Sequence, residues 1–132
     1  MDCTDLKQSK ELIELGLKVE SADLVWCRDN DKSEDWKLRI KDWNVNTDMF
    51  SFRNGLVRPA WSAEALLMEI PETIKVKDVC FNFSLSYKEG YLYAAYRDET
   101  FDTIMYRGRW KSLVCMLTDI MKWLLKNKYK NI

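Results

Sequence analysis

Apolar and polar side chains alternate at every position between Val79 and Tyr87. This two-residue period is typical of a β-strand with one buried and one exposed face. The following segment, 88–90, ends on Gly90 and predicts a three-residue hairpin turn with glycine in the left-handed conformation. We therefore expect residues 91–97 to form the antiparallel partner strand.

Three other segments have the three-to-four-residue period of amphipathic helices. The first covers residues 7–15 and is followed by Gly16, where a left-handed C-terminal cap is expected. The second begins after Ser62, a residue type that caps the first turn of a helix, and ends before Pro71. The third and longest is expected over residues 109–127.

Shorter alternating stretches predict four further strands, at residues 24–28, 36–41, 49–53 and 102–106. In the second of these, Trp36, Leu38 and Ile40 alternate with basic residues, which predicts one buried and one solvated face. The order of elements, with connections too short for parallel crossovers, predicts an α+β fold. We expect one antiparallel sheet of about four to six strands, with two longer helices and one short helix packed mainly on one face.

A single domain over residues 1–132 is expected, because the chain has 132 residues and no linker-like segment. The 21 basic and 21 acidic residues give a net charge of zero, so the whole molecule has no bulk attraction for polyanions. Charge is nevertheless uneven along the chain. Residues 1–35 contain ten acids and five bases, whereas residues 109–132 contain one acid and six bases.

The composition also excludes several classes of catalytic and nucleotide-binding site. The chain has no histidine and four glycines, which excludes Ser-His-Asp and Cys-His nucleophilic machinery, phosphate-cradling P-loops and GxGxxG dinucleotide turns. We expect no cofactor and no metal site. The pattern favours a protein that is not an enzyme, and it leaves open a carboxylate-based hydrolase that would use Asp98, Glu99 or Asp102.

The compartment is indicated by the cysteines and the N-terminus. Cys3, Cys27, Cys80 and Cys115 match neither a CxxC redox motif nor paired zinc-ligand spacing, so we expect isolated thiols. The first residues lack the basic and apolar segments of a secretion signal, and no run of about 18 uncharged apolar residues is present. A cytoplasmic protein without a membrane partner is expected.

Six tryptophans exceed what a core of this size requires, so some are expected at the surface, with Trp43 and Trp123 as the leading candidates. This favours a non-enzymatic protein that binds a partner protein or a second copy of itself. Single-stranded nucleic-acid binding is the alternative. Lys37, Arg39 and Lys41 would then hold phosphates next to Trp43, or the lysines of the last helix and tail would do so.

Three blocks spread over nearly the whole chain carry a further signal. They are Ser9-Lys10-x-Leu-x-x-Leu-Gly-Leu, Pro59-Ala60-Trp61-Ser62-x-x-Ala-Leu-Leu and Trp123-Leu-Leu-x-Asn-Lys. Together they resemble a family of small uncharacterised proteins of gut anaerobes and their phages or mobile elements. The resemblance implies an intracellular single-domain protein with a phage or mobile-element association. Because that family has no assigned activity, no catalytic residue can be carried over from it. The family tends to begin its last helix with threonine-proline, whereas residues 107–110 here are Arg-Gly-Arg-Trp.

Overall fold

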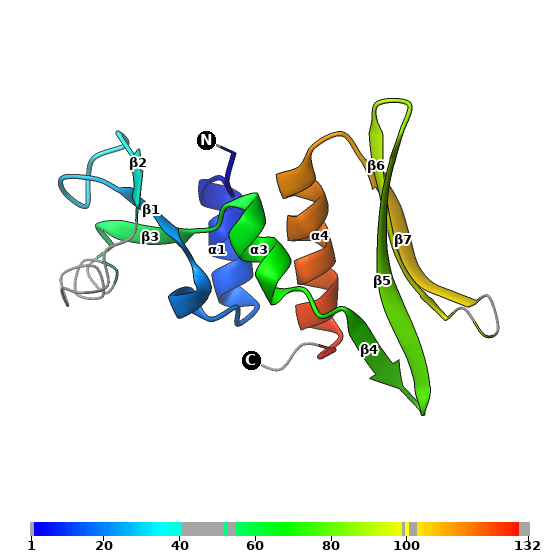
Figure 1. Cartoon of the computed structure of the whole chain (residues 1–132). Helices are drawn as coiled ribbons and strands as arrows, with labels where there is room; N and C mark the ends of the chain where they lie inside the picture. Colours follow the sequence, from blue (N-terminus) through cyan, green and yellow to red (C-terminus); the bar gives the residue numbers. More distant parts are fainter. Residues whose placement is uncertain (1, 41–51, 53–54, 99, 101–102, 130–132) are drawn as a thin grey trace.

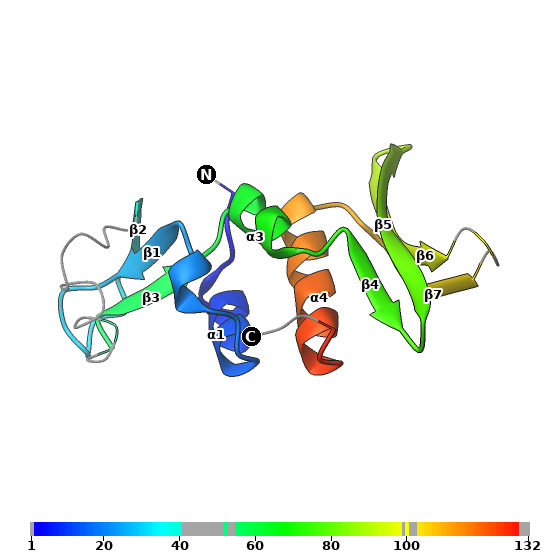
Figure 2. The same ribbon diagram turned by 60° about the horizontal axis from the view of Figure 1, so that its bottom comes forward.

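The computed structural model describes residues 2–40, 52, 55–98, 100 and 103–129, and these fold into three layers. Helices form the middle layer, and an antiparallel sheet lies on either side of them (Figure 1). The view turned about the horizontal axis shows the same order (Figure 2). The expected α+β class is confirmed, but the strands form two sheets, of three and four strands, rather than one.

The three-stranded sheet contains β1 (Leu24–Cys27), β2 (Lys37–Ile40) and β3 (Val57–Ala60), in the order β2-β1-β3. Both strand pairs are antiparallel, and a short 3-10 helix, η1 (Val19–Ser21), precedes β1. Strand β3 contains Pro59, which has no N–H to donate. Its position at the edge of the sheet accommodates this, since an edge strand leaves half of its backbone groups outside the ladder.

The four-stranded sheet contains, in spatial order, β4 (Thr73–Val76), β5 (Val79–Lys88), β6 (Tyr91–Asp98) and β7 (Thr103–Trp110). All neighbours are antiparallel. The turn between β5 and β6 has two residues rather than the expected three, because Lys88 pairs with Tyr91. Glu89 and Gly90 both have positive φ, as type I′ hairpins require.

The helices of the described residues, apart from η1, are α1 (Leu6–Glu14), α3 (Ala63–Glu69) and α4 (Leu113–Lys126). Each begins after a residue whose side chain accepts a hydrogen bond from a first-turn amide, namely Asp5, Ser62 and Ser112. Ser62 is the cap expected from the sequence. Gly16, two residues after the end of α1, has the expected left-handed conformation with φ of 100°.

Helix α4 supplies much of the core. Its buried residues are Val114, Met116, Leu117, Thr118, Ile120, Met121, Leu124 and Leu125. The apolar ones belong to one cluster with Leu12 of α1, Leu66 of α3, and Phe81 and Tyr96 of the four-stranded sheet. The core therefore joins all three helices to the inner face of that sheet.

Several sequence expectations need correction. The last helix starts at Leu113 and not near residue 109, because residues 107–110 continue β7. In β2 the expected buried face is only partly formed, since Trp36 and Leu38 are half-buried but Ile40 is 73% exposed. Strands β3 and β4 were not predicted, and the strand expected at residues 49–53 lies outside the described residues apart from residue 52.

Candidate functional site

The outer face of the four-stranded sheet, directed away from the helices, carries basic side chains. The register places every second residue of each strand on this face. The basic residues at these positions are Lys75, Lys88, Arg97, Arg107 and Arg109. Among the described residues no aspartate or glutamate occupies an outward strand position in this sheet, and Asp78 in the β4–β5 turn lies 3.8 Å from Lys75.

Part of this face is a hollow of about 520 Å³. Its lining consists of Ser84, Ser86, Tyr93, Ala94, Ala95, Arg97, Ile104, Arg107, Gly108 and Arg109. The floor is low because the outward residues at the centre of β5 and β6 are serine and alanine, whereas longer basic side chains stand on β7 and at the end of β6. We call this hollow and its lining the basic hollow.

Of the arginines in the basic hollow, Arg109 contacts an aromatic ring. The guanidinium carbon of Arg109 lies 4.4 Å from the centre of the Tyr91 ring, and the Lys111 ammonium lies 5.5 Å from the same ring. Cation–π contacts of this kind fix the direction of a long basic side chain. Among the described residues none forms an ion pair with Arg107 or Arg109, so no described carboxylate neutralises these two charges.

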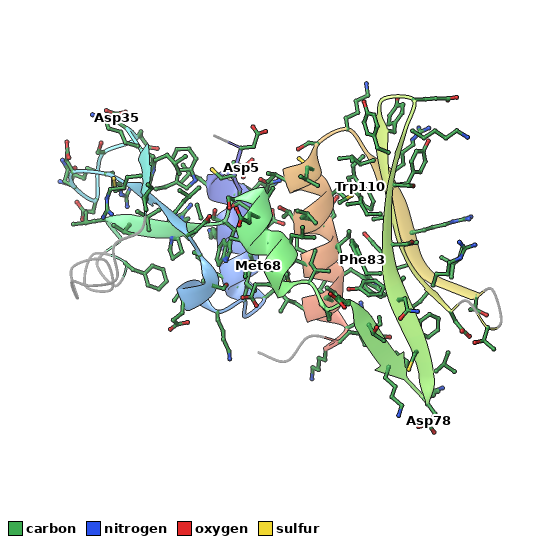
Figure 3. All side chains as sticks on the ribbon, viewed as in Figure 1. Asp5, Asp35, Met68, Asp78, Phe83 and Trp110 are labelled. Carbon is green, nitrogen blue, oxygen red and sulfur yellow. The ribbon has the colours of Figure 1, made fainter. Side chains whose placement is uncertain are left out.

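The opposite face of the same strands is anchored firmly to α4. Trp110 donates its indole N–H to Asp119 at 2.8 Å, and the Tyr106 ring stacks on Trp123 with centroids 4.5 Å apart. Burial raises the pKa of Tyr106, and the Asp119 carboxylate raises it further. Figure 3 shows Phe83 and Trp110 between α4 and the sheet, while nitrogen-tipped side chains extend from the other face. The basic hollow is thus built on a rigid support.

The basic residues chosen from the sequence lie elsewhere. Lys37 and Arg39 are exposed on β2, at the edge of the other sheet, and Lys37 lies 4.0 Å from the Asp35 carboxylate. Lys41 and Trp43 lie outside the described residues. Binding through these four residues stays a prediction, and the structure does not bring Lys37 or Arg39 near the basic hollow.

Trp123, the other aromatic candidate, is half-buried among aromatic rings. It contacts Tyr96, Tyr106 and Tyr129, with ring centroids 5.7, 4.5 and 5.2 Å away. It therefore widens the apolar face of α4 and packs against the sheet, and a role in partner binding stays a prediction.

The remaining described tryptophans also have structural partners. Trp61 is fully buried and donates to Ser21, Trp26 donates to the Thr4 carbonyl oxygen, and Trp36 lies beneath the guanidinium of Arg28. The surplus of tryptophan is thus largely explained by packing and hydrogen bonding.

The carboxylate candidates do not form a described cluster. Asp98 is buried, and its Oδ1 accepts a hydrogen bond from the Thr100 amide at 3.0 Å, while Glu99 and Asp102 lie outside the described residues. Within the described chain there is also no group of three or more residues placed to hold a metal ion. The hydrolase alternative therefore gains no geometric support.

A local signal for the basic hollow was present in the sequence. Arg107 and Arg109 are two residues apart, and so are Tyr91 and Tyr93, which is the spacing that places side chains on one face of a strand. The sequence pattern alone does not group these two arginines, because it predicts a helix from residue 109 and so separates Arg109 from the strand expected at residues 102–106.

Comparisons with known proteins add no relative: no family model, no curated protein and no solved structure matches this chain. The resemblance noted from the sequence therefore stays a prediction. None of the described helices has the length and apolar character needed to cross a bilayer.

Proposed function

We propose that this protein binds single-stranded nucleic acid in the basic hollow. The observation that carries the proposal is a hollow whose described lining contains three arginines and a tyrosine and includes no carboxylate, on a chain whose net charge is zero. A neutral protein that gathers arginines on one sheet face is suited to a polyanionic ligand. This is the binding alternative expected from the sequence, placed on a different sheet.

The chemistry of the lining suits the two parts of a nucleotide. Arginine forms paired hydrogen bonds to phosphate oxygens and keeps its charge at all physiological pH values. Tyr93 offers an aromatic face on which an unpaired base can stack. Serine hydroxyls on β5 supply neutral donors and acceptors to bases or sugars. Open sheet faces that combine basic and aromatic residues are a common platform for single strands.

The size of the basic hollow favours a single strand over a duplex. At about 520 Å³ it is comparable to pockets that hold one small ligand, and therefore accommodates roughly one or two nucleotides. A duplex would present its phosphates and keep its bases stacked inside, so Tyr93 would have no base to contact. We therefore expect tighter binding to an unpaired oligonucleotide than to a duplex of the same sequence.

A group of exposed acids lies far from the basic hollow. The loop before β2 contains the exposed residues Asp29, Asp31, Glu34 and Asp35. Figure 3 places Asp35 at the end of the molecule opposite the four-stranded sheet. These acids are therefore too far from the basic hollow to oppose a polyanion that binds there.

The test is a fluorescence anisotropy titration with a labelled thymidine dodecamer. Arg107→Gln and Arg109→Gln should each weaken binding about tenfold, since a charge-assisted hydrogen bond contributes about 1.4 kcal/mol or more. In the double variant the slope of log affinity against log salt should fall by about 1.4, for two lost phosphate contacts.

Lys37→Gln/Arg39→Gln is the matched control, because it removes the same charge from an exposed strand of the other sheet. It should bind like the wild type. Unchanged binding by the Arg107→Gln/Arg109→Gln variant, or an equal loss in the control, would contradict the proposal.

We also infer a reducing cytoplasmic compartment. The proposal is supported by four free cysteines, of which Cys80 and Cys115 are exposed. A phage or mobile-element association, expected from the resemblance alone, remains a proposal of the same kind.

A further inference from the structure

One half of β5 has an unpaired edge. Strand β4 pairs only with the first part of β5, from Val79 to Asn82, and the Phe83 amide makes the last hydrogen bond on this side, to the Glu72 carbonyl oxygen at 2.8 Å. Residues 84–88 continue past β4, and all five are exposed. In Figure 1 the β5–β6 turn stands at the top of the view, at the end of β5 opposite to β4.

The backbone groups on this edge belong to two residues. Because the direction of N–H and C=O alternates along a strand, Leu85 and Tyr87 direct theirs to the same side as Phe83. By the same alternation Ser84, Ser86 and Lys88 direct their backbone groups towards β6, the neighbouring strand on the other side. Among the described residues no hydrogen bond to the backbone of Leu85 or Tyr87 is made on that side. The edge thus presents two donors and two acceptors.

Both edge residues also expose apolar side chains. Leu85 is 45% and Tyr87 is 72% exposed, and both lie on the inner face of the sheet, beyond the part that α4 covers. An exposed strand edge with apolar side chains is a template for pairing with another strand. Natural sheets usually protect such an edge with a charge, a proline or a covering segment, and among these residues only Lys88, next to the turn, is charged.

We propose that two copies of the chain pair through residues 84–88 of β5, antiparallel and about a two-fold axis at Ser86. This register places Leu85 opposite Tyr87 of the partner subunit, and Tyr87 opposite Leu85 of the partner subunit. Those are the residues whose backbone groups point outward, so each of the two pairs exchanges both of its N–H···O=C bonds. Ser86 lies opposite Ser86 of the partner subunit, at the position that needs no hydrogen bond across the interface.

The side chains fit a second copy in this register. On the inner face the Leu85 side chain meets the Tyr87 ring of the partner subunit, an aliphatic–aromatic pair that stabilises antiparallel strands. On the outer face Lys88 faces Ser84 of the partner subunit, so no like charges are opposed. The same five residues supply both halves of the interface, as a two-fold contact requires.

The pairing would join the two four-stranded sheets into one of eight strands. Ser84 and Ser86 line the basic hollow and lie on the paired strand, so the two hollows would share one outer face. The inference rests on the free edge and not on the proposed function. If the experiments refute the dimer, the proposed nucleic-acid binding still stands, and the dimer likewise does not depend on that binding.

Disulfide trapping tests the register directly. The full chain with Cys80→Ser and Cys115→Ser, which removes the exposed thiols, is the background. In it Ser86→Cys should cross-link to a dimer under mild oxidation, because paired residues at this type of position have Cα atoms about 4.5 Å apart, within the range of about 4.4 to 6.8 Å that a disulfide spans.

Ser84→Cys is the matched control, because it is also an exposed serine on the same face of β5. Its two copies would be four residues apart along the strand, about 13 Å, and should not cross-link. Tyr87→Lys, without added cysteines, should shift the sedimentation equilibrium of the native chain from dimer towards monomer. The control Thr103→Lys, on the edge strand β7, should not.

Absence of a Ser86→Cys dimer, or equal cross-linking of Ser84→Cys, would overturn the inference, provided that the circular dichroism spectra match the parent. A native chain that stays monomeric over a roughly hundredfold concentration range would overturn it as well. In that case the edge would be left for an extended segment of another protein.

Discussion

The indole ring of Trp110 lies across Gly108, in the space where any other side chain would begin. A Cβ on Gly108 would be 2.3 Å from Trp110 Cη2, far inside van der Waals contact. The ring cannot move away freely, because its N–H donates to Asp119 on α4. Gly108 therefore leaves room for the Trp110 ring to lie over β7 and donate to Asp119 on α4, directly behind the basic hollow.

Gly108→Ala is expected to destabilise the protein by about 1–3 kcal/mol, the usual cost of forcing extra volume into a packed site. Chemical unfolding followed by circular dichroism measures this. In a Trp110→Leu background, which removes the ring, the same substitution should cost much less. Equal costs in the two backgrounds would show that the Trp110 contact is not the reason for glycine.

At Thr118 a substitution is expected to stabilise the protein rather than destabilise it. Its hydroxyl is fully buried on α4, and it has no hydrogen-bond partner among the described residues. Thr118→Val keeps the shape and removes the unsatisfied polar group, so it should stabilise the protein by about 1 kcal/mol.

Ser112→Ala provides the comparison on the same helix. It removes the N-terminal cap of α4, so the free energy of unfolding should fall by about 1 kcal/mol. A loss of stability in Thr118→Val would indicate that the hydroxyl has a partner after all.

An ion pair between α1 and α4 predicts a pH dependence. Lys122 donates to the Glu11 carboxylate, and this hydrogen bond lowers the pKa of Glu11 below its ordinary value of 4.5, against the opposing effect of burial. Because the folded state binds this proton less readily than the unfolded chain, the pair stabilises the fold above a pH of about 4.5. That contribution is lost as the pH falls through the lowered folded pKa.

Between a pH of about 6 and a pH of about 3, the wild type should therefore lose more stability than Glu11→Gln, which cannot titrate at this position. Urea unfolding at a series of pH values measures the difference. Parallel pH profiles for the two proteins would mean that the ion pair does not act on stability.

Local signals in the sequence predicted much of the secondary structure. The alternation from Val79 and the cap at Ser62 each depend on neighbouring residues only, and both elements formed as expected. The start of the last helix was wrong because Trp110 is three residues before Leu113, so it fits a helix as well as a strand. Only pairing with β6 decides the matter, since it places Trp110 opposite Leu92.

The sequence could not predict which distant segments lie next to one another in the fold. Alternation shows that a strand has two faces but not which strand is its neighbour, so the division into two sheets could not be foreseen. For the same reason the sequence could not show which basic pair lies in the basic hollow. Lys37 and Arg39 have the same spacing as Arg107 and Arg109, and only the fold places the second pair beside Tyr93.

The most direct test of the central claim is an amide chemical-shift titration of the nitrogen-15 labelled protein with a single-stranded thymidine dodecamer. Binding in the basic hollow should shift the amides of Ser84, Ser86, Tyr93, Ala95 and Arg107 first, and added salt should reverse the shifts. Shifts concentrated on β2 or the end of α4, or none at low salt, would contradict the account.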